Sequence, residues 1–187
     1  MHSQTKLNLL LALAMMLAFV LACNSGDETE KANKLVADGN AAITDGNKMA
    51  TEFGPKLDKL FDDMSPASFE ADKEKFAPQA KEIVDGLTKA GDKYRDASKK
   101  FDEASKLKIN DKFKEYLTLK SQEFSKRAEQ MDVGKGNAQA VLDSNDVDSL
   151  KTKINANKTK YDKLDQESKD LESKASKIQA ENKDKIQ

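Results

Sequence analysis

The sequence of this chain predicts an all-α protein, an elongated antiparallel helical bundle of about four helices with coiled-coil-like packing. Apolar residues recur at alternating steps of three and four over most of the chain, which is the spacing of one helical stripe. Charged residues make up 35% of the 187 residues, aromatic residues make up 6%, and there are three prolines, a balance typical of long exposed helices. The period-two alternation of a half-buried strand is nowhere sustained.

The first helical segment is predicted to begin at Lys31 and to contain a break. Its apolar residues are Leu35, Val36, Ile43, Met49, Phe53, Leu57, Leu60, Phe61 and Met64. Pro55 has no amide hydrogen to donate, and Gly54 beside it is a poor helix former. We therefore expect Gly54-Pro55 to bend or end the helix, so that this segment forms two pieces.

The second segment opens with a strong start signal. Ser65 offers a side chain that can accept the first free amide, and Pro66 loses nothing at the first helical position. Pro78 is expected to kink this helix near its start. The stripe consists of Phe76, Ala80, Ile83, Leu87, Ala90, Tyr94, Ala97, Phe101 and Ala104. We expect the segment to end between Leu107 and Asp111.

The third segment has a rougher stripe. Its apolar members are Phe113, Leu117, Phe124, Ala128, Met131, Ala138, Val141 and Leu142. Lys120 takes one apolar place, and Gly134-Lys135-Gly136 leaves open a bend or a break in the helix. The glycine pair is not a nucleotide loop, because Gln139 stands where the third glycine of a dinucleotide fingerprint belongs and no strand precedes it.

The fourth segment follows a break across Asp143 to Asp146. Its stripe is Val147, Leu150, Ile154, Asn157, Tyr161, Leu164, Ser168, Leu171, Ala175 and Ile178. A buried amide at Asn157 demands a partner, and it is expected to fix helix register. Helices of about 35 to 40 residues reach roughly 50 to 60 Å, so the sequence predicts a rod.

The run from Asp143 to Asp148 resembles a calcium-binding loop only superficially. Asp148 stands where such a loop needs glycine, and Ile154 stands where it needs a bidentate glutamate. We expect instead a turn that ends in a helix cap provided by Asp146 or Asp148.

Asp38-Gly39-Asn40 recurs seven residues on as Asp45-Gly46-Asn47. This spacing of about two turns places both glycines on one helix face. We interpret them as sites where two helices approach closely, and we regard a ligand groove as the less favoured alternative.

The N-terminal segment has the features of an export signal. Residues 9–22 carry no charge, and Lys6 precedes them. At ~1.5 Å per residue this run is too short for a hydrocarbon core of ~30 Å, so it predicts a secretory signal segment rather than a membrane span. The expected organisation is a signal peptide at residues 1–22, a lipidated cysteine with a flexible tether at 23–30, and a bundle domain at 31–187.

The run Val20-Leu21-Ala22-Cys23 resembles the lipobox of bacterial lipoproteins. The resemblance implies cleavage between Ala22 and Cys23 and acylation of the Cys23 sulfur. Two or three acyl chains hold a protein durably on a membrane. By the family's Gram-negative sorting rule, Asn24 favours the outer membrane, with the domain facing the periplasm or the surface. The alternative is an ordinary signal peptide followed by a free cysteine.

The composition excludes several classes of function. The single cysteine is Cys23 and the single histidine is His2, so the expected mature chain has neither histidine nor a free thiol. We therefore predict no enzyme, with no catalytic residue, cofactor or metal site. Lys and Arg number 32 against 33 Asp and Glu, a balance that does not predict nucleic-acid binding.

These observations predict a membrane-anchored, non-enzymatic lipoprotein that acts as an interaction or envelope-structural module. The expected partners are the membrane, through the lipid on Cys23, and an envelope protein or other macromolecule. The alternative is a binder or carrier of an apolar small molecule or lipid, because thin bundles can open an apolar slot. The aromatic residues that would line such a slot, or otherwise form the core, are Phe69, Phe76, Tyr94 and Phe101.

Overall fold

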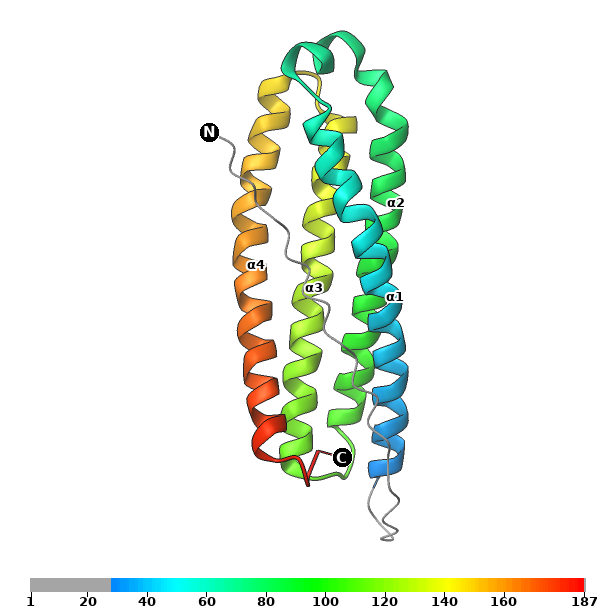
Figure 1. Cartoon of the computed structure of the whole chain (residues 1–187), viewed down its shortest axis with the longest axis vertical. Helices are drawn as coiled ribbons and strands as arrows, with labels where there is room; N and C mark the ends of the chain where they lie inside the picture. The colour runs from blue at the N-terminus through cyan, green and yellow to red at the C-terminus, as the bar shows by residue number, and fades with distance from the viewer. Residues whose placement is uncertain (1–27, 187) are drawn as a thin grey trace.

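A computed structural model describes residues 28–186 of the chain as a rod of antiparallel helices (Figure 1). Its four helices are α1 (Thr29–Asp62), α2 (Pro66–Ser105), α3 (Asp111–Asp143) and α4 (Val147–Glu181). Within the described range there is no strand. The predicted all-α bundle is confirmed, and the turns between its four helices lie near Ser65, before Asp111 and across Asp143 to Asp146, as expected. Among the described helices, none combines the length and the apolar character that crossing a membrane requires.

The start of α2 is fixed by a reciprocal cap. The Ser68 amide donates to the Ser65 side-chain oxygen at 3.1 Å, and the Ser65 amide donates to the Ser68 side-chain oxygen at 2.9 Å. Pro66 occupies the first helical position. Two amides that a helix start leaves free are therefore satisfied within four residues, as the sequence predicted for Ser65 and Pro66.

The prediction that Gly54-Pro55 divides the first segment is wrong. α1 runs unbroken from Thr29 to Asp62 with Pro55 inside it, and it begins two residues before the expected start at Lys31. Proline at this position removes one backbone bond, to the carbonyl of Thr51. Both Pro55 and Thr51 are exposed, so water can satisfy the freed carbonyl while the opposite face of the helix stays packed.

The departure of α2 from helical geometry lies at Asp72, six residues before the proline expected to cause it. Asp72 has φ −151° and ψ 42°, whereas the helix continues through Pro78. Phe69 and Phe76, which flank Asp72, are both buried, with 2% and 6% of their surface exposed. The change of direction at Asp72 therefore accompanies the packing of both rings into the core.

α3 is continuous through its glycine pair, which settles the question that the sequence left open. Gly134 packs against Leu87 of α2, since a Cβ built there would lie 3.1 Å from a Leu87 methyl. Gly136 faces Asn157 of α4, at 3.4 Å by the same measure. The two glycines thus leave space for side chains of both neighbouring helices, and they do not interrupt α3.

α1 packs against α2 through a repeating exchange of aromatic rings and glycines. Each ring fills the space that a glycine leaves on the facing helix, and the α1 members recur every seven residues, as in coiled coils. The three pairs are Gly39 with Phe101, Gly46 with Tyr94, and Phe53 with Gly86. The interpretation of Gly39 and Gly46 as close-approach sites is therefore confirmed.

The helices associate in chain order: α1 packs on α2, α2 on α3, and α3 on α4. In the described helices no Cα of α1 lies within 8 Å of a Cα of α4, so this side of the bundle is the least closely packed (Figure 1). Among the described residues, the apolar core forms two clusters along the rod, and the buried members of both lie between Ala32 and Ile186.

Candidate functional site

The predicted lipidation and cleavage residues, Ala22 and Cys23, lie outside the described residues, as does Asn24. The first described residue is Glu28, whose amide donates to the Lys108 carbonyl at 3.0 Å. The Glu28 carboxylate in turn accepts the Lys108 amide at 2.9 Å, and this bond lowers the pKa of Glu28. These bonds hold the start of α1 against the α2–α3 loop, so the chain enters the rod at that end (Figure 1).

The predicted cap at the α3–α4 turn is provided by Asp146. Its carboxylate accepts the Ser149 amide at 2.7 Å at the start of α4. Ser144 in the same turn is fully buried, and its carbonyl accepts a bond from the Lys73 ammonium at 2.8 Å. This turn therefore connects α3 and α4 and also contacts α2 through Lys73.

Asn157 has the polar partner that the sequence predicted. Its side-chain nitrogen donates to the Asn137 side-chain oxygen on α3 at 2.8 Å, beside Gly136. A Cβ built on Gly136 would lie 3.4 Å from that nitrogen, in ordinary contact. The pair therefore sets the register between α3 and α4, and its role is structural.

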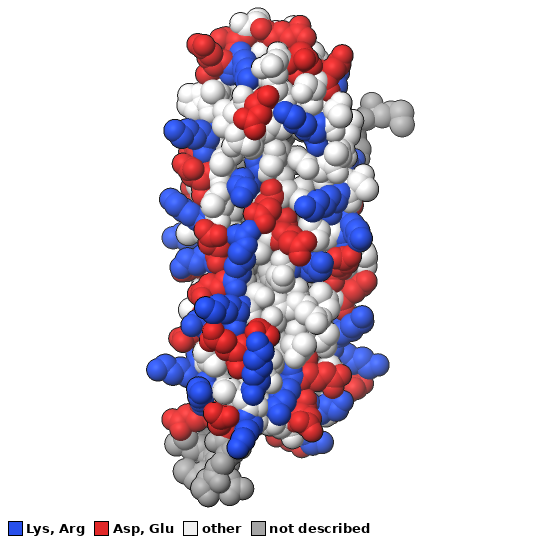
Figure 2. All heavy atoms as spheres, turned by 180° about the vertical axis from the view of Figure 1, so that it is seen from behind, with Lys and Arg blue, Asp and Glu red and all other residues white. Residues whose placement is uncertain are grey.

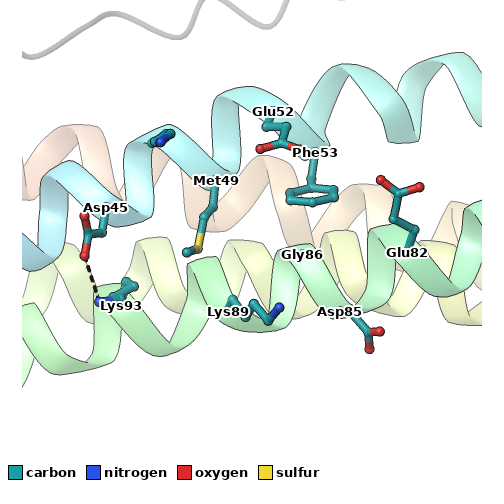
Figure 3. Close-up of a pocket in the computed structure, with 10 residues that line it drawn as sticks. Asp45, Met49, Glu52, Phe53, Glu82, Asp85, Gly86, Lys89 and Lys93 are labelled. Carbon is teal, nitrogen blue, oxygen red and sulfur yellow. Dashed lines mark hydrogen bonds and ion pairs between the residues drawn. The ribbon is translucent and has the colours of Figure 1, made fainter.

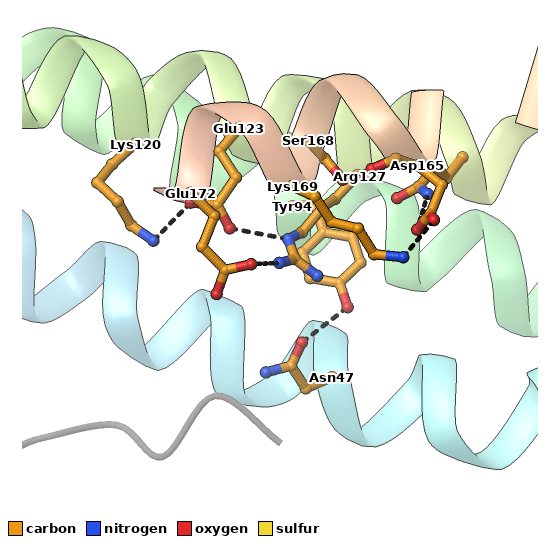
Figure 4. A network of polar contacts seen from close by, with 10 residues as sticks. Asn47, Tyr94, Lys120, Glu123, Arg127, Asp165, Ser168, Lys169 and Glu172 are labelled. Atoms are coloured by element: carbon orange, nitrogen blue, oxygen red, sulfur yellow. Dashed lines mark hydrogen bonds and ion pairs between the residues drawn. The ribbon is translucent and has the colours of Figure 1, made fainter. Parts of the chain in front are cut away.

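A buried carboxylate, Glu123, lies at the centre of a charged network between α3 and α4 (Figure 4). Only 1% of its side chain is exposed. It receives the Lys120 ammonium at 2.6 Å and the Arg127 guanidinium at 2.9 Å. Arg127 extends on to Glu172 of α4 at 3.1 Å. Both cations lie over the Phe124 ring, so the network is embedded in the core.

Further polar side chains continue this layer across the rod. Gln130 donates to Asp165 at 3.3 Å, and Asp165 also pairs with Lys169. On the opposite side, the Tyr94 hydroxyl donates to Asn47 of α1 at 2.8 Å (Figure 4). Burial raises the pKa of Tyr94 to about 12, so the hydroxyl stays protonated at neutral pH and serves as a donor. The bond between Tyr94 and Asn47 joins α2 to α1, and the bonds of Arg127 and Gln130 join α3 to α4.

Both arginines of the chain tie neighbouring helices together. Arg127 joins α3 to α4 as described, and Arg95 of α2 donates to Asp132 of α3 at 2.5 Å. Desolvation acts to raise the pKa of Asp132, but the bond to Arg95 and the positive charges of Arg95 and Lys135 outweigh it and hold the pKa below its usual value. Planar guanidinium groups suit such fixed pairs, which explains where the two arginines are placed.

A groove of about 520 Å³ runs between α1 and α2 (Figure 3). Met49, Phe53 and Gly86 supply its apolar part, and an ion pair of 2.8 Å between Asp45 and Lys93 crosses one end. The remaining lining residues are the charged side chains Lys48, Glu52, Glu82, Asp85 and Lys89. The groove therefore presents a narrow apolar strip between charged walls.

Lys56 bonds two acidic residues of the groove and lies over its aromatic ring. The Lys56 ammonium lies 4.5 Å from the centre of the Phe53 ring and bonds Glu52 and Glu82 at 3.2 and 2.7 Å. The hydrogen bond that the Lys56 ammonium donates to Glu82 is the main cause that raises the pKa of Lys56. Because Lys56 covers the ring and links both walls, an apolar ligand entering here would first have to displace a doubly paired cation.

Sequence reasoning did not identify Glu123, Arg127 or the Phe53–Gly86 groove. Two signals pointed toward the network: Lys120 in an apolar place of the stripe, and the scarcity of arginine. The aromatic residues proposed as core, or as the lining of an apolar slot, are all buried in the two core clusters. In the described residues no group of three or more His, Cys, Asp or Glu side chains is arranged to hold a metal ion.

No known family, curated protein or solved structure matches this chain.

Proposed function

We propose that this chain is a membrane-anchored bacterial lipoprotein whose helical bundle serves as a non-enzymatic interaction or envelope-structural module. The observation that carries the proposal is the lipobox-like run Val20-Leu21-Ala22-Cys23 behind a 14-residue uncharged segment. Only four residues separate Cys23 from Glu28, which is held at one end of the rod. A lipid on Cys23 would therefore attach the bundle to a membrane by that end.

The surface of the rod supports a role in binding macromolecules. Acidic and basic side chains alternate over the face shown in Figure 2. Long helical faces of this kind offer extended contact area, whereas a carrier of apolar molecules needs a pocket lined mainly by apolar side chains. The α1–α2 groove, with its charged walls and the cover of Lys56, fits that second role poorly.

The anchor is tested by labelling expressing cells with a clickable fatty acid. Wild-type protein should incorporate the label and should begin at residue 23 when its amino terminus is sequenced. Cys23→Ala should lose both properties, and the neighbouring Ser25→Ala should keep both. An unlabelled wild-type protein, or a mature terminus at another residue, would refute the anchor.

The sorting expectation has its own test in a Gram-negative host. Wild-type protein should fractionate with the outer membrane, and Asn24→Asp should move it to the inner membrane, since aspartate after the cysteine is the family's retention signal. The same distribution of wild type and Asn24→Asp between the two membranes would contradict the outer-membrane assignment. It would leave the proposal of lipidation at Cys23 standing.

The choice between partner binding and ligand carriage is tested on protein purified from cells. In-cell crosslinking should give reproducible protein adducts, and solvent extraction should yield no stoichiometric lipid by mass spectrometry. A bound apolar molecule at one per chain, without a reproducible adduct, would replace the proposed module with the carrier.

A further inference from the structure

The first half of α4 carries a basic face that the rest of the bundle does not neutralise. Four lysines, Lys151, Lys153, Lys158 and Lys160, lie on it, and all four are exposed. No acidic residue occurs between Asp148 and Asp162. None of the four lysines forms an ion pair with an acid of the described chain, whereas Lys163 immediately beyond pairs with Glu167 at 3.8 Å.

The four lysines form two rails along the helix. Lys151 and Lys158 are seven residues apart on one flank of the apolar stripe, and Lys153 and Lys160 are seven apart on the other. Each rail therefore repeats after roughly 10 Å. The residues on the solvent side between the rails are small and uncharged: Thr152, Asn155, Ala156 and Thr159.

The residues of this face favour a partner that is bound through its negative charge alone. Protein partners are usually anchored by buried aromatic or large apolar side chains, and the face between the rails offers none. Specific phosphate recognition uses the planar fork of arginine, and both arginines of this chain are engaged elsewhere, in pairs with Asp132 and Glu172. Two rows of lysines suit a surface on which negative charges are dense and can move sideways to meet them.

We infer that the Lys151–Lys160 face of α4 binds the anionic phospholipid headgroups of a bilayer and lays the rod along the membrane. Lysines near such a surface attract it without fixed geometry, and each contributes a factor of about five in binding. The orientation, though not the binding, rests on the proposed anchor at Cys23.

The antiparallel topology makes this orientation specific. α1 begins at the end of the rod that holds the α2–α3 loop, and α4 begins at the opposite end (Figure 1). From Lys153 to the end of α4 is roughly 40 Å along the helix. Five extended residues after Cys23 span at most about 17 Å, so the lipid can reach past the side of α1 as well as past its end. A flat orientation of the rod would bring the anchor and the basic face to one bilayer.

The test uses a chain of residues 24–187, which contains every core residue of the described range and lacks Cys23. We measure its co-sedimentation with vesicles of phosphatidylcholine alone and with vesicles containing an equal amount of phosphatidylglycerol. Binding is expected for the anionic vesicles only, and it should weaken as salt rises from about 0.05 M toward 1 M. Lys153→Gln with Lys160→Gln should reduce binding about 25-fold, and replacement of all four lysines should abolish it.

The matched control is Lys99→Gln with Lys106→Gln, which removes two exposed lysines at the same spacing, one in α2 and one at its C-cap. These lysines pair with Glu103 and Asp102, so their loss should change binding less than twofold. Unchanged helical circular dichroism shows that each variant is folded. Equal losses in both double variants, equal binding to neutral vesicles, or binding to soluble polyphosphate but not to vesicles would each overturn the inference. Fatty-acid labelling of Cys23 is read separately, so failure of the anchor and failure of the basic face are distinguishable.

Discussion

The ring of Phe53 on α1 lies directly over the bare backbone of Gly86 on α2 (Figure 3). A Cβ built on Gly86 would lie 2.3 Å from the ring, closer than non-bonded carbon atoms approach. A mid-helix glycine costs about 1 kcal/mol relative to alanine, and at this position the close contact of two helices compensates for that cost.

Gly86→Ala should therefore destabilise the protein by about 1 to 3 kcal/mol, although alanine is the better helix former, because the new methyl group forces the ring aside. Denaturant unfolding measures the loss. Gly136→Ala is the matched control, because its Cβ would lie 3.4 Å from the Asn157 side chain, in ordinary contact. Phe53→Ala in the Gly86→Ala background should recover part of the loss. Equal stability of the two alanine variants would show that the ring does not lie where we place it.

The apolar stripe of α2 predicts a graded response to truncation. Ile83 is fully buried and Leu87 is 3% exposed, so Ile83→Ala and Leu87→Ala should each cost about 2 to 5 kcal/mol. Lys99→Ala and Lys163→Ala remove side chains that are 72% and 76% exposed, and these changes should stay within about 0.5 kcal/mol. Urea melts that give the same loss at all four positions would contradict the bundle.

The features that the sequence predicted correctly depend on neighbours in the chain. Ser65-Pro66 and Asp146 act within four residues, and the α2 stripe depends only on helical spacing. The error at Pro55 has a different origin. Whether a proline breaks a helix depends on whether the freed carbonyl meets water or a packed neighbour, and that depends on the face that α1 turns to α2.

The candidate sites were less predictable because they depend on register between helices. Arg127 meets Glu172 across 45 positions of sequence, and one chain offers many acids at comparable distances. Phe53 and Gly86 come together only once α1 and α2 are aligned. The close-approach role of Gly39 and Gly46 could be predicted from the sequence, because glycines seven residues apart lie on one helix face and favour close contact with a neighbouring helix.

Arg127 should matter more for stability than any exposed cation. Arg127→Met keeps the length of the stem but removes the guanidinium, which leaves the buried Glu123 with Lys120 as its remaining partner. Because Arg127 is itself about a quarter exposed, we expect a loss of roughly 1 to 3 kcal/mol rather than the full cost of an isolated buried charge.

Lys163→Met serves as the control for Arg127→Met, since it breaks the exposed 3.8 Å pair with Glu167 and should cost less than about 0.5 kcal/mol. Replacing Glu123 by Gln in the Arg127→Met background should recover stability, because the fully buried carboxylate is removed and the glutamine oxygen can still accept the bond from Lys120. A double variant less stable than Arg127→Met alone would show that the underpaired Glu123 carboxylate is not the cause of the loss of stability.

The three tyrosines of the chain predict how stability falls at high pH. Burial raises the pKa of Tyr94 and of Tyr116 to about 12 and also raises that of Tyr161. The folded protein therefore keeps phenolic protons that the unfolded chain releases near pH 10. Since the folded state binds more protons, the stabilisation is complete below pH 10 and is lost as pH rises from 10 toward 12. Phenolate absorbance should consequently appear together with the loss of helical circular dichroism rather than before it.

Tyr94→Phe separates this effect from the titration of lysines in the same pH range. At pH 7 the variant should be less stable by about 1 kcal/mol, because the bond from the hydroxyl to Asn47 is lost. Between pH 10 and 12 it should lose less stability than wild type, by on the order of 2 kcal/mol, since the most buried phenol no longer titrates. Urea melts at several pH values measure both differences. A third of the wild-type phenolate signal appearing near pH 10 with the helices intact would show that one tyrosine is exposed, and parallel pH profiles for the two proteins would show that Tyr94 is not the buried donor of the polar layer.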